Sequence, residues 1–236
     1  MRARLRKALD WFRARDLQLI AALAGIGILL LAFIAIADEV SELSTQKFDE
    51  AILLALRAAP DDPLGSHAVE AGVMHISALG SSVVTTLIVI IVTGFFALAG
   101  HWRYAGLVVA SSVGCAVVMS LLKGLFERAR PTVVTHLDPP GGLSFPSGHS
   151  TISAALYMTL AVLIARTLDK RRLRVYVVCM GVLMMVLIGV SRLYLGVHYP
   201  TDVLAGWCIG SAWALGCWAL MTRLQRTGQV EPPSSP

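Results

Sequence analysis

The sequence predicts an all-α integral membrane protein, built as a single bundle of six transmembrane helices. Of its 236 residues, 56% are hydrophobic and only 15% are charged, whereas soluble domains average about 45–50% and about 25%. A transmembrane helix needs about 20 apolar residues, so the chain has room for roughly five to seven spans. The net charge is +5. In a membrane protein such an excess reflects Lys and Arg residues in cytoplasmic loops, so no nucleic-acid partner is predicted.

The amino-terminal region combines a basic segment with the first apolar run. Residues 1–16 carry six basic side chains, and Leu5, Leu9 and Phe12 recur at helical spacing. This pattern predicts a short amphipathic helix at the membrane surface. The run at 17–37 ends in AIA, as a signal-peptidase site does. Its length of about 21 residues exceeds the roughly 7–15 of a signal sequence, so we interpret it as an uncleaved anchor.

An acidic connection follows at 38–80, with eight acidic and two basic residues. Phe48, Ile52 and Leu56 fall on one helical face, and a turn, APDDPLG, comes next. We therefore expect an outer-face helical loop that lies against the membrane or over the bundle.

Five further apolar runs complete the predicted six-span domain, which covers 17–222. They lie at about 81–99, 104–122, 149–167, 174–190 and 203–221. The polar, proline-rich segment 223–236 is predicted to be a disordered cytoplasmic tail.

The distribution of basic residues predicts which side of the membrane each segment faces. Six spans put both termini on one side with the connections at 101–103 and 166–174, and this side holds 14 of the 20 Lys and Arg residues. The other side, formed by 38–80, 123–148 and 191–202, holds six. Because Lys and Arg collect in cytoplasmic loops, both termini are predicted to be cytoplasmic. The chain is expected in the cytoplasmic membrane.

Three segments on the predicted outer side carry reactive side chains, each at the end of a span. They are KGLFERARP from Lys123, FPSGHST around His149, and SRLYLGVHYPTD, which ends at Asp202. Four of the six outer-side basic residues lie in the two connections that contain these segments. Cations are usually kept on the cytoplasmic side, so a functional reason for these four is expected.

The chemistry of these segments fits a phosphate group. Guanidinium groups match tetrahedral phosphate oxygens, and lysine adds a point charge. The PSGHST segment is predicted to open the fourth span, where a helix N-terminus presents free N–H groups to an anion. Ser147 adds a hydroxyl, and Gly148 allows the backbone to approach an oxygen closely.

Two histidines can divide the work of nucleophile and general acid. Pro200 favours the first position of a helix, which places His198 just before the sixth span and Asp202 in its first turn. The carboxylate can accept from one ring nitrogen of His198 and leave the other as a nucleophile. His149, at a different helix end, can protonate the leaving oxygen.

Together the segments resemble the signature motifs of the type 2 phosphatidic acid phosphatase family. The matching residues are Lys123 with Arg130-Pro131, then Pro146-Ser147-Gly148-His149, then Ser191-Arg192 with His198 and Asp202. The match covers about 80 residues directly, from Lys123 to Asp202, and the six-span layout is similar over most of the remainder.

The resemblance implies a role for each motif residue. His198 attacks phosphorus and forms a phosphohistidine, Asp202 orients it, and His149 protonates the leaving alcohol and later activates water. The phosphate oxygens are held by Lys123, Arg130, Ser147, Gly148 and Arg192. The resemblance implies no metal or other cofactor, which agrees with the lack of a carboxylate cluster suited to magnesium in the sequence.

Five neighbouring residues are interpreted differently. Arg128 lies outside the motif pattern, and His136 and Asp138 are expected to be solvated loop residues. Ser191 belongs to a motif but is expected to be a helix-end residue without a phosphate contact. Tyr199 either lines the pocket or anchors the chain at the membrane interface.

The predicted function is a membrane lipid phosphatase, with the lipid tail in the bilayer and the phosphate at its boundary. Expected substrates are phosphatidic acid, phosphatidylglycerol phosphate or undecaprenyl pyrophosphate, and membrane lipids are the expected partners; the oligomeric state is left open. A lipid phosphotransferase on the same scaffold is the alternative. A transporter is disfavoured because the charges gather at one face. The vanadium haloperoxidases, which share the motifs, are soluble.

Overall fold

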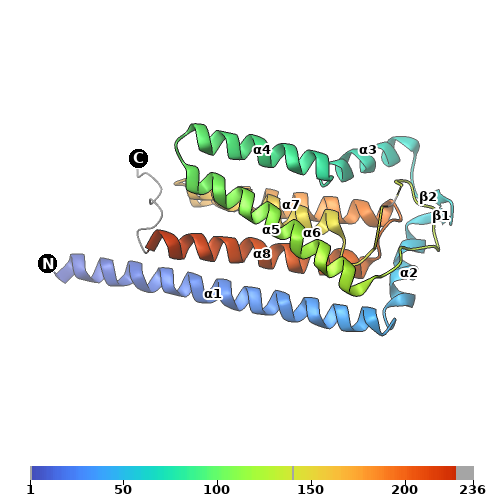
Figure 1. Cartoon of the computed structure of the whole chain (residues 1–236), viewed down its shortest axis with the longest axis horizontal. Helices are drawn as coiled ribbons and strands as arrows, with labels where there is room; N and C mark the ends of the chain where they lie inside the picture. Colours follow the sequence, from blue (N-terminus) through green and yellow to red (C-terminus); the bar gives the residue numbers. More distant parts are fainter. Residues whose placement is uncertain (1, 140, 227–236) are drawn as a thin grey trace.

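The structure is a computed structural model that describes residues 2–139 and 141–226 (Figure 1). Its helices are α1 (Arg2–Ser41), α2 (Gln46–Ala55), α3 (His67–Ala78), α4 (Ser82–Leu98), α5 (Trp102–Phe126), α6 (Gly148–Arg166), α7 (Arg171–Tyr194) and α8 (Pro200–Arg226). A short antiparallel hairpin joins α2 to α3 and consists of β1 (Arg57–Ala59) and β2 (Asp62–Pro63). The fold is therefore all-α apart from this hairpin within the described ranges.

Five of these helices are long and apolar enough to cross a membrane: α1 from Leu17 onward, α5, α6, α7 and α8. The helices α3 and α4 follow one another with a bend of 45°, and only together are they long and apolar enough to count as a sixth, broken span. The side chain of Tyr157 donates to the carbonyl oxygen of Leu79 at the bend, with a distance of 2.8 Å. The predicted all-α membrane bundle is thus confirmed, with five spans, or six when the bent pair α3–α4 is counted as one.

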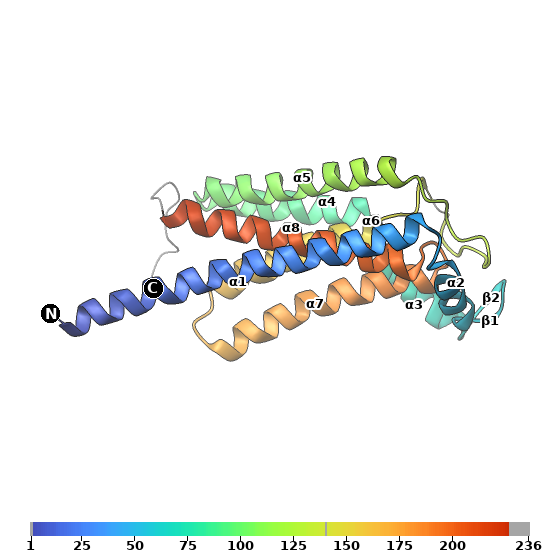
Figure 2. The same cartoon turned by 90° about the horizontal axis from the view of Figure 1, so that it is seen from below.

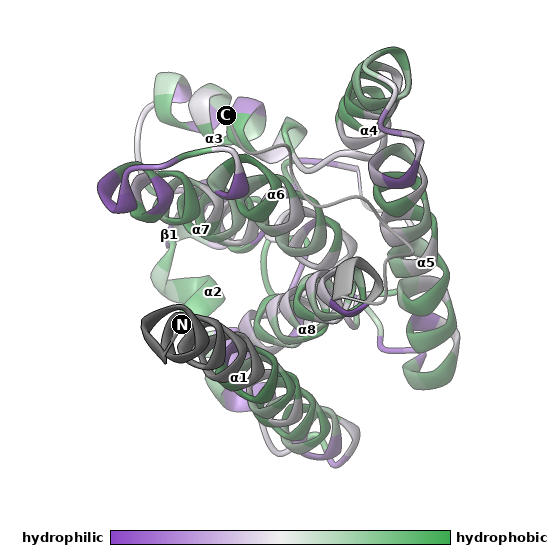
Figure 3. Cartoon of the chain, turned by 90° about the vertical axis from the view of Figure 1, so that its left-hand side faces the viewer, coloured by the Kyte–Doolittle hydropathy of each residue, from purple (hydrophilic) through white to green (hydrophobic). Residues whose placement is uncertain are grey.

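The helices differ in how much of their apolar surface is covered by protein. In α6 half of the most apolar window is buried inside the protein, in α8 39%, and in α1 only 11%. A helix whose apolar side chains lie mostly outside the protein needs an apolar solvent, which the bilayer supplies. Figure 3 shows the helices seen from one end, with hydrophobic residues along most of them. The inner pair α6 and α8 therefore forms the core on which the site is built.

Close packing of α6 against α8 depends on two glycines one turn apart, Gly206 and Gly210. A Cβ atom on Gly206 would lie 2.9 Å from the carbonyl oxygen of Ser147, and one on Gly210 would clash with the carbonyl oxygen of Thr151. Small residues at this spacing let membrane helices approach closely. The contact fixes the start of α6 against the first turns of α8.

The connections divide between the two ends of the bundle (Figures 1 and 2). The start of α1 and the end of α8 lie at one end. The opposite end holds α2, the hairpin, and the connections from α5 to α6 and from α7 to α8. All three reactive segments are therefore at the end away from the start of α1 and the end of α8.

Three predicted boundaries are corrected by the structure. The backbone of residues 2–16 continues α1 without a break, whereas a separate surface helix over 1–16 was expected. The expected outer loop 38–80 is shorter, because α1 extends to Ser41 and α3 already belongs to the bundle. The predicted tail 223–236 begins as helix, and residues 227–236 lie outside the described part of the chain.

The residues of α2 that the protein buries completely are not those of the apolar face formed by Phe48, Ile52 and Leu56. Phe48 is 55% exposed, whereas Asp49 and Leu53 are fully buried. Leu53 packs with Val134 and Tyr199 beneath the outer connections. The buried face of α2 is set by Asp49, whose buried partners include Arg128 and are described below.

Candidate active site

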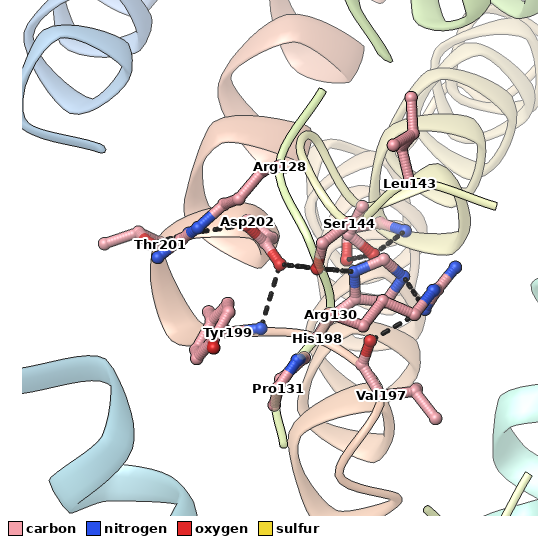
Figure 4. A network of polar contacts seen from close by, with 12 residues as sticks. Arg128, Arg130, Pro131, Leu143, Ser144, Val197, His198, Tyr199, Thr201 and Asp202 are labelled. Atoms are coloured by element: carbon pink, nitrogen blue, oxygen red, sulfur yellow. Dashed lines mark hydrogen bonds and ion pairs between the residues drawn. The ribbon is translucent and has the colours of Figure 1, made fainter. Parts of the chain in front are cut away.

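Asp202 lies at the centre of a buried polar network (Figure 4). Its Oδ2 accepts from the hydroxyl of Ser144 at 2.5 Å and from the backbone N–H of Tyr199 at 2.9 Å. The same oxygen lies 3.3 Å from Nδ1 of His198, and Oδ1 accepts from Nη1 of Arg128 at 2.7 Å. The Asp202 side chain is fully buried. A carboxylate with this many donors has one fixed orientation.

The contacts of His198 determine which of its ring nitrogens is free to react. Nη1 of Arg130 lies 3.3 Å from Nε2, and because a guanidinium can only donate, Nε2 presents its lone pair. The proton is therefore on Nδ1, facing Asp202. Burial lowers the pKa of His198 to about 4, although Asp202 opposes this shift. The ring is neutral near pH 7, with Nε2 available as a nucleophile.

Two cations of the first motif, Arg130 and Lys123, hold the loop before α6, and Arg130 also lies beside this ring. Arg130 donates from Nε to the carbonyl oxygen of Gly142 at 3.0 Å and from Nη2 to that of Gly141 at 2.7 Å. The ammonium of Lys123 donates to the carbonyl oxygen of Leu143. Burial and the nearby charge of Arg192 lower the pKa of Arg130. Cations this close to one another attract an anion between them.

Arg192 is held by an acidic residue of the α5–α6 connection. Its Nη1 donates to Asp138 at 2.9 Å and to the hydroxyl of Ser77 at 2.6 Å. Its Nε is buried without a hydrogen-bond partner. The carboxylate of Asp138 occupies part of the guanidinium edge that a phosphate would use. Asp138 was expected to be solvated, and this is corrected, because its side chain is 42% exposed but ion-paired.

His136 is likewise not the solvated residue that the sequence suggested. It is partly buried, and its Nε2 lies 2.6 Å from the carbonyl oxygen of Pro131. This contact closes the turn that follows Arg130.

The start of α6 brings the second motif to the same place. Ser147 is the N-cap, and its hydroxyl accepts from the N–H and the hydroxyl of Ser150 at 3.4 and 3.0 Å. The helix geometry leaves the N–H groups of Gly148 and His149 without intrahelical acceptors. A Cβ atom on Gly148 would lie 3.7 Å or more from Met119 and Lys123. The protein's own packing therefore does not require glycine there.

His149 stands apart from the bonded cluster. Within the described chain it makes no hydrogen bond or ion pair, and its ring lies near Gly80 at the bend between α3 and α4. An imidazole with free ring nitrogens beside a helix N-terminus can give or take a proton from a bound group.

The turn before His198 is braced from the outer hairpin. Gly196 has a φ of +75°, and a Cβ atom there would lie 2.8 Å from Nη2 of Arg57. Arg57, which is buried, donates from Nη1 to the carbonyl oxygen of Tyr194 at 2.8 Å and from Nη2 to that of Thr135 at 3.4 Å. Only glycine combines this backbone conformation with so close an approach, so the reach of Arg57 fixes the turn.

Arg128, which the motif spacing did not select, lies inside the polar network. Its side chain is 8% exposed and bridges two carboxylates, Asp202 and Asp49 of α2. Its guanidinium carbon lies 4.1 Å above the ring of Tyr199. Tyr199 is buried, so it is not an exposed interfacial anchor. Ser191, by contrast, is a buried helix-end residue as expected, and its hydroxyl donates to the carbonyl oxygen of Ile188.

The structure thus brings most of the predicted site residues into one cluster. His198, Asp202 and Arg130 are in direct contact, and Ser147 contacts Asp202 through the backbone. Lys123 and Arg192 approach from two other span ends. His149 and Gly148 sit at the start of α6, without a hydrogen bond to His198. Among the described residues, no group of three or more His, Cys, Asp or Glu side chains could hold a metal ion.

Known proteins with similar sequences are phosphatases of lipids. Phosphatidylglycerophosphatase B of Bacillus subtilis is 36% identical over 186 residues, which cover 77% of this chain and 87% of that protein. Undecaprenyl-diphosphatase of Sulfolobus acidocaldarius is 35% identical over 45% of each chain.

The fold has a solved counterpart as well. A transmembrane PAP2-type phosphatidylglycerolphosphate phosphatase from Bacillus subtilis superposes with a TM-score of 0.78 at 27% identity. The superposition covers 85% of this chain and 98% of that one. The sequence profile of the PAP2 superfamily matches residues 100–226, which include all three motifs. This confirms the resemblance predicted from the motifs: the chain belongs to the PAP2 superfamily.

Proposed function

We propose that the chain is a membrane lipid phosphatase that removes a terminal phosphate through a phosphohistidine at His198. One observation carries this proposal: Nε2 of His198 faces Arg130 while Nδ1 is fixed by Asp202. A neutral imidazole oriented in this way is a nucleophile aimed at the point where cations would gather phosphate oxygens. The comparisons with known proteins agree on lipid phosphatase activity.

In the proposed first step, the substrate phosphate takes over the donors that now bind protein carbonyls. Lys123, Arg130 and Arg192 neutralise its charge, and Arg192 exchanges Asp138 for a phosphate oxygen. Ser147 and the N–H of Gly148 complete the cradle at the start of α6. Cations and aligned N–H groups stabilise the transferring phosphoryl group.

The bond changes then follow from the arrangement of the two histidines. Nε2 of His198 attacks phosphorus, the P–O bond to the lipid breaks, and His149 gives its proton to the leaving alkoxide. In the second step His149 takes a proton from water, the resulting hydroxide attacks phosphorus, and the P–N bond breaks. Inorganic phosphate leaves, and His198 regains its neutral form with the proton on Nδ1.

The substrate class follows from where the site lies. The catalytic cluster is at one end of apolar helices, so a lipid can keep its tail in the bilayer while its phosphate enters the cluster. We propose phosphatidylglycerol phosphate, phosphatidic acid or undecaprenyl pyrophosphate as the substrate. The two named bacterial and archaeal relatives act on two of these classes.

The orientation in the membrane is also a proposal. The start of α1 and the end of α8 share one end of the bundle with the basic connections. Basic loops stay in the cytoplasm, so we infer that both termini are cytoplasmic and that the site faces the periplasm or cell exterior. The enzyme would then act on the outer leaflet of the cytoplasmic membrane.

The direct test is phosphate release by the purified full chain from vesicles that each contain one of the three lipids, with a metal chelator present. We expect release that is inhibited by vanadate and abolished by His198→Ala. His67→Ala is the matched control, because His67 is fully exposed on the outer side. Full activity of His198→Ala would overturn the assignment. Appearance of labelled phosphate in another lipid, with none in water, would indicate the phosphotransferase alternative.

A further inference from the structure

We propose that Asp49 and Arg128 form a positioning pair that holds Asp202, and through it His198, in the reactive geometry. The inference rests on the proposed function of His198 and deepens it. Asp49 lies in α2, outside the region that the PAP2 profile matches. The outer helix α2 is therefore assigned a role in catalysis, in addition to covering the bundle.

Arg128 contacts Asp202 on the side away from the histidine. Its Nη1 donates to Oδ1 of Asp202 at 2.7 Å, whereas His198 lies next to Oδ2. Because the guanidinium is planar, binding at Oδ1 sets the plane of the carboxylate. Arg128 thereby determines the direction in which Oδ2 meets Nδ1 of His198.

Asp49 holds the other end of the same guanidinium. Its Oδ2 accepts from Nη2 of Arg128 at 2.8 Å. Both oxygens also bind the first turn of α8: Oδ1 accepts from the N–H of Thr201 at 3.1 Å and Oδ2 from its hydroxyl at 2.6 Å. Helix starts carry unpaired N–H groups and a positive dipole end, which an acidic side chain stabilises. Asp49 thus caps α8 from another helix, immediately beside Asp202.

Asp49, Arg128 and Asp202 are buried charges, so each depends on the others for compensation. Asp49 and Asp202 are fully buried and Arg128 is 8% exposed. Buried charges are tolerated when they are paired, and removing one partner leaves the others uncompensated. The ring of Tyr199, one residue after His198, stacks on the same guanidinium at 4.1 Å. Asp49 and Arg128 together therefore contact the segment 198–202 at three residues, Tyr199, Thr201 and Asp202.

The effect on catalysis can be separated from an effect on folding. If the pair acts only by orienting Asp202, then Asp49→Asn and Arg128→Gln lower kcat and leave KM nearly unchanged, because both side chains are buried and bonded to groups of the protein. We expect losses on the order of 10- to 100-fold, the size seen when the partner of an orienting group is lost. Arg128→Lys, which keeps the charge without the fork, is expected to lose less than Arg128→Gln.

The experiment is a double-mutant cycle on the full chain in detergent, with kcat, KM and the thermal midpoint measured for each variant. Asp49→Asn combined with Arg128→Gln is expected to be little worse than Arg128→Gln alone, since both act through one contact chain. Glu50→Gln is the matched control: Glu50 is the next residue of α2 and bonds within that helix to Gln46. It should retain wild-type kcat.

A second measurement does not depend on activity. The ring nitrogen signals of His198, observed by NMR in histidine-labelled protein, should shift in folded Arg128→Lys and Asp49→Asn and stay in place in Glu50→Gln. Wild-type kcat together with an unshifted His198 signal in folded Asp49→Asn and Arg128→Lys overturns the positioning role. Failure of wild-type protein to hydrolyse any lipid phosphate would instead overturn the proposed function, and the NMR result would still decide the positioning role.

Discussion

The backbone N–H of Ser147 donates to the carbonyl oxygen of Asp202 at 3.0 Å. This bond joins the N-cap of α6 to the first turn of α8, and so joins two motifs through residues that are 55 positions apart in sequence. One motif holds the predicted phosphate cradle and the other holds the nucleophile. The distance between the two motifs is therefore set by the packing of α6 against α8, and contacts within the pocket are not needed to maintain it.

The contact between the start of α6 and the first turns of α8 predicts the effect of substituting Gly206. Its Cβ atom would lie 2.9 Å from both the Ser147 carbonyl oxygen and the Cβ atom of Ser150, so Gly206→Ala must push α6 and α8 apart. We expect a loss of about 1–3 kcal/mol in the free energy of unfolding and a fall in kcat. Both are measurable by denaturation and turnover in detergent.

Gly216 of α8 supplies the control for this change, because a Cβ atom there meets nothing within 4 Å. Gly216→Ala should leave activity unchanged. Equal stability and activity in the two variants would show that the α6–α8 contact is not what sets the site.

Gly148 offers a separate test of the phosphate cradle. The protein leaves room for a Cβ atom at this position, so Gly148→Ala should fold with an unchanged thermal midpoint. Its methyl group would occupy space needed by a phosphate oxygen at the helix start, and we expect KM to rise about tenfold. Gly124→Ala, at an open position of α5, should change neither quantity. An unchanged KM in Gly148→Ala would exclude the N–H of Gly148 as a phosphate donor.

The burial of His198 predicts a low pKa for its ring and a matching pH dependence of stability. Burial lowers its pKa to about 4, compared with about 6.5 for an unfolded chain. As the pH falls from about 6.5 to about 4, the unfolded chain binds a proton that folded His198 does not, so the folded state loses stability in that window. Above pH 6.5 this group adds no pH dependence. NMR titration of the His198 ring, assigned by its loss in His198→Gln, should give a midpoint near 4; a midpoint at 6–7 would contradict the buried, neutral ring.

If Asp138 competes with phosphate for Arg192, removing its charge should increase the affinity of the site for a phosphate analogue. Asp138→Asn removes a partly exposed ion pair, which is worth about 0.2–1 kcal/mol. The inhibition constant of vanadate should therefore fall by about 1.5- to 5-fold. Asp61→Asn, which removes an exposed acid from the outer hairpin, controls for the change in net charge. Weaker vanadate binding in Asp138→Asn would mean that the carboxylate orients Arg192 and does not compete with the ligand.

Much of the fold could be predicted because the bilayer imposes strong rules on sequence. Span length indicated the apolar helices of the bundle, and the placement of Lys and Arg indicated that the start of α1 and the end of α8 lie at the same end. The motif residues could be predicted too, since each lies at a span end where its neighbours in space are limited. The bend at 79–81 was not predicted, because the polar residues around it were interpreted as the end of a loop.

Asp49 could not be found by the same reasoning. It is one of eight acidic residues in 38–80, and its neighbours Phe48 and Ile52 suggested that a different face of α2 is buried. Only its contacts with Arg128 and Thr201, 79 and 152 residues away, distinguish it from the other acids. Pairings at such separations depend on tertiary packing, which local periodicity does not encode.

The central claim is that Nε2 of His198 forms a bond to phosphorus. The most direct measurement is a rapid alkaline quench of the full chain during turnover of a ³²P-labelled lipid phosphate, followed by mass spectrometry of the labelled peptide. Phosphohistidine at His198 is predicted in the wild type and in the His67→Ala control, with no label in His198→Ala. Label on another residue, or label that persists in His198→Ala, would contradict it.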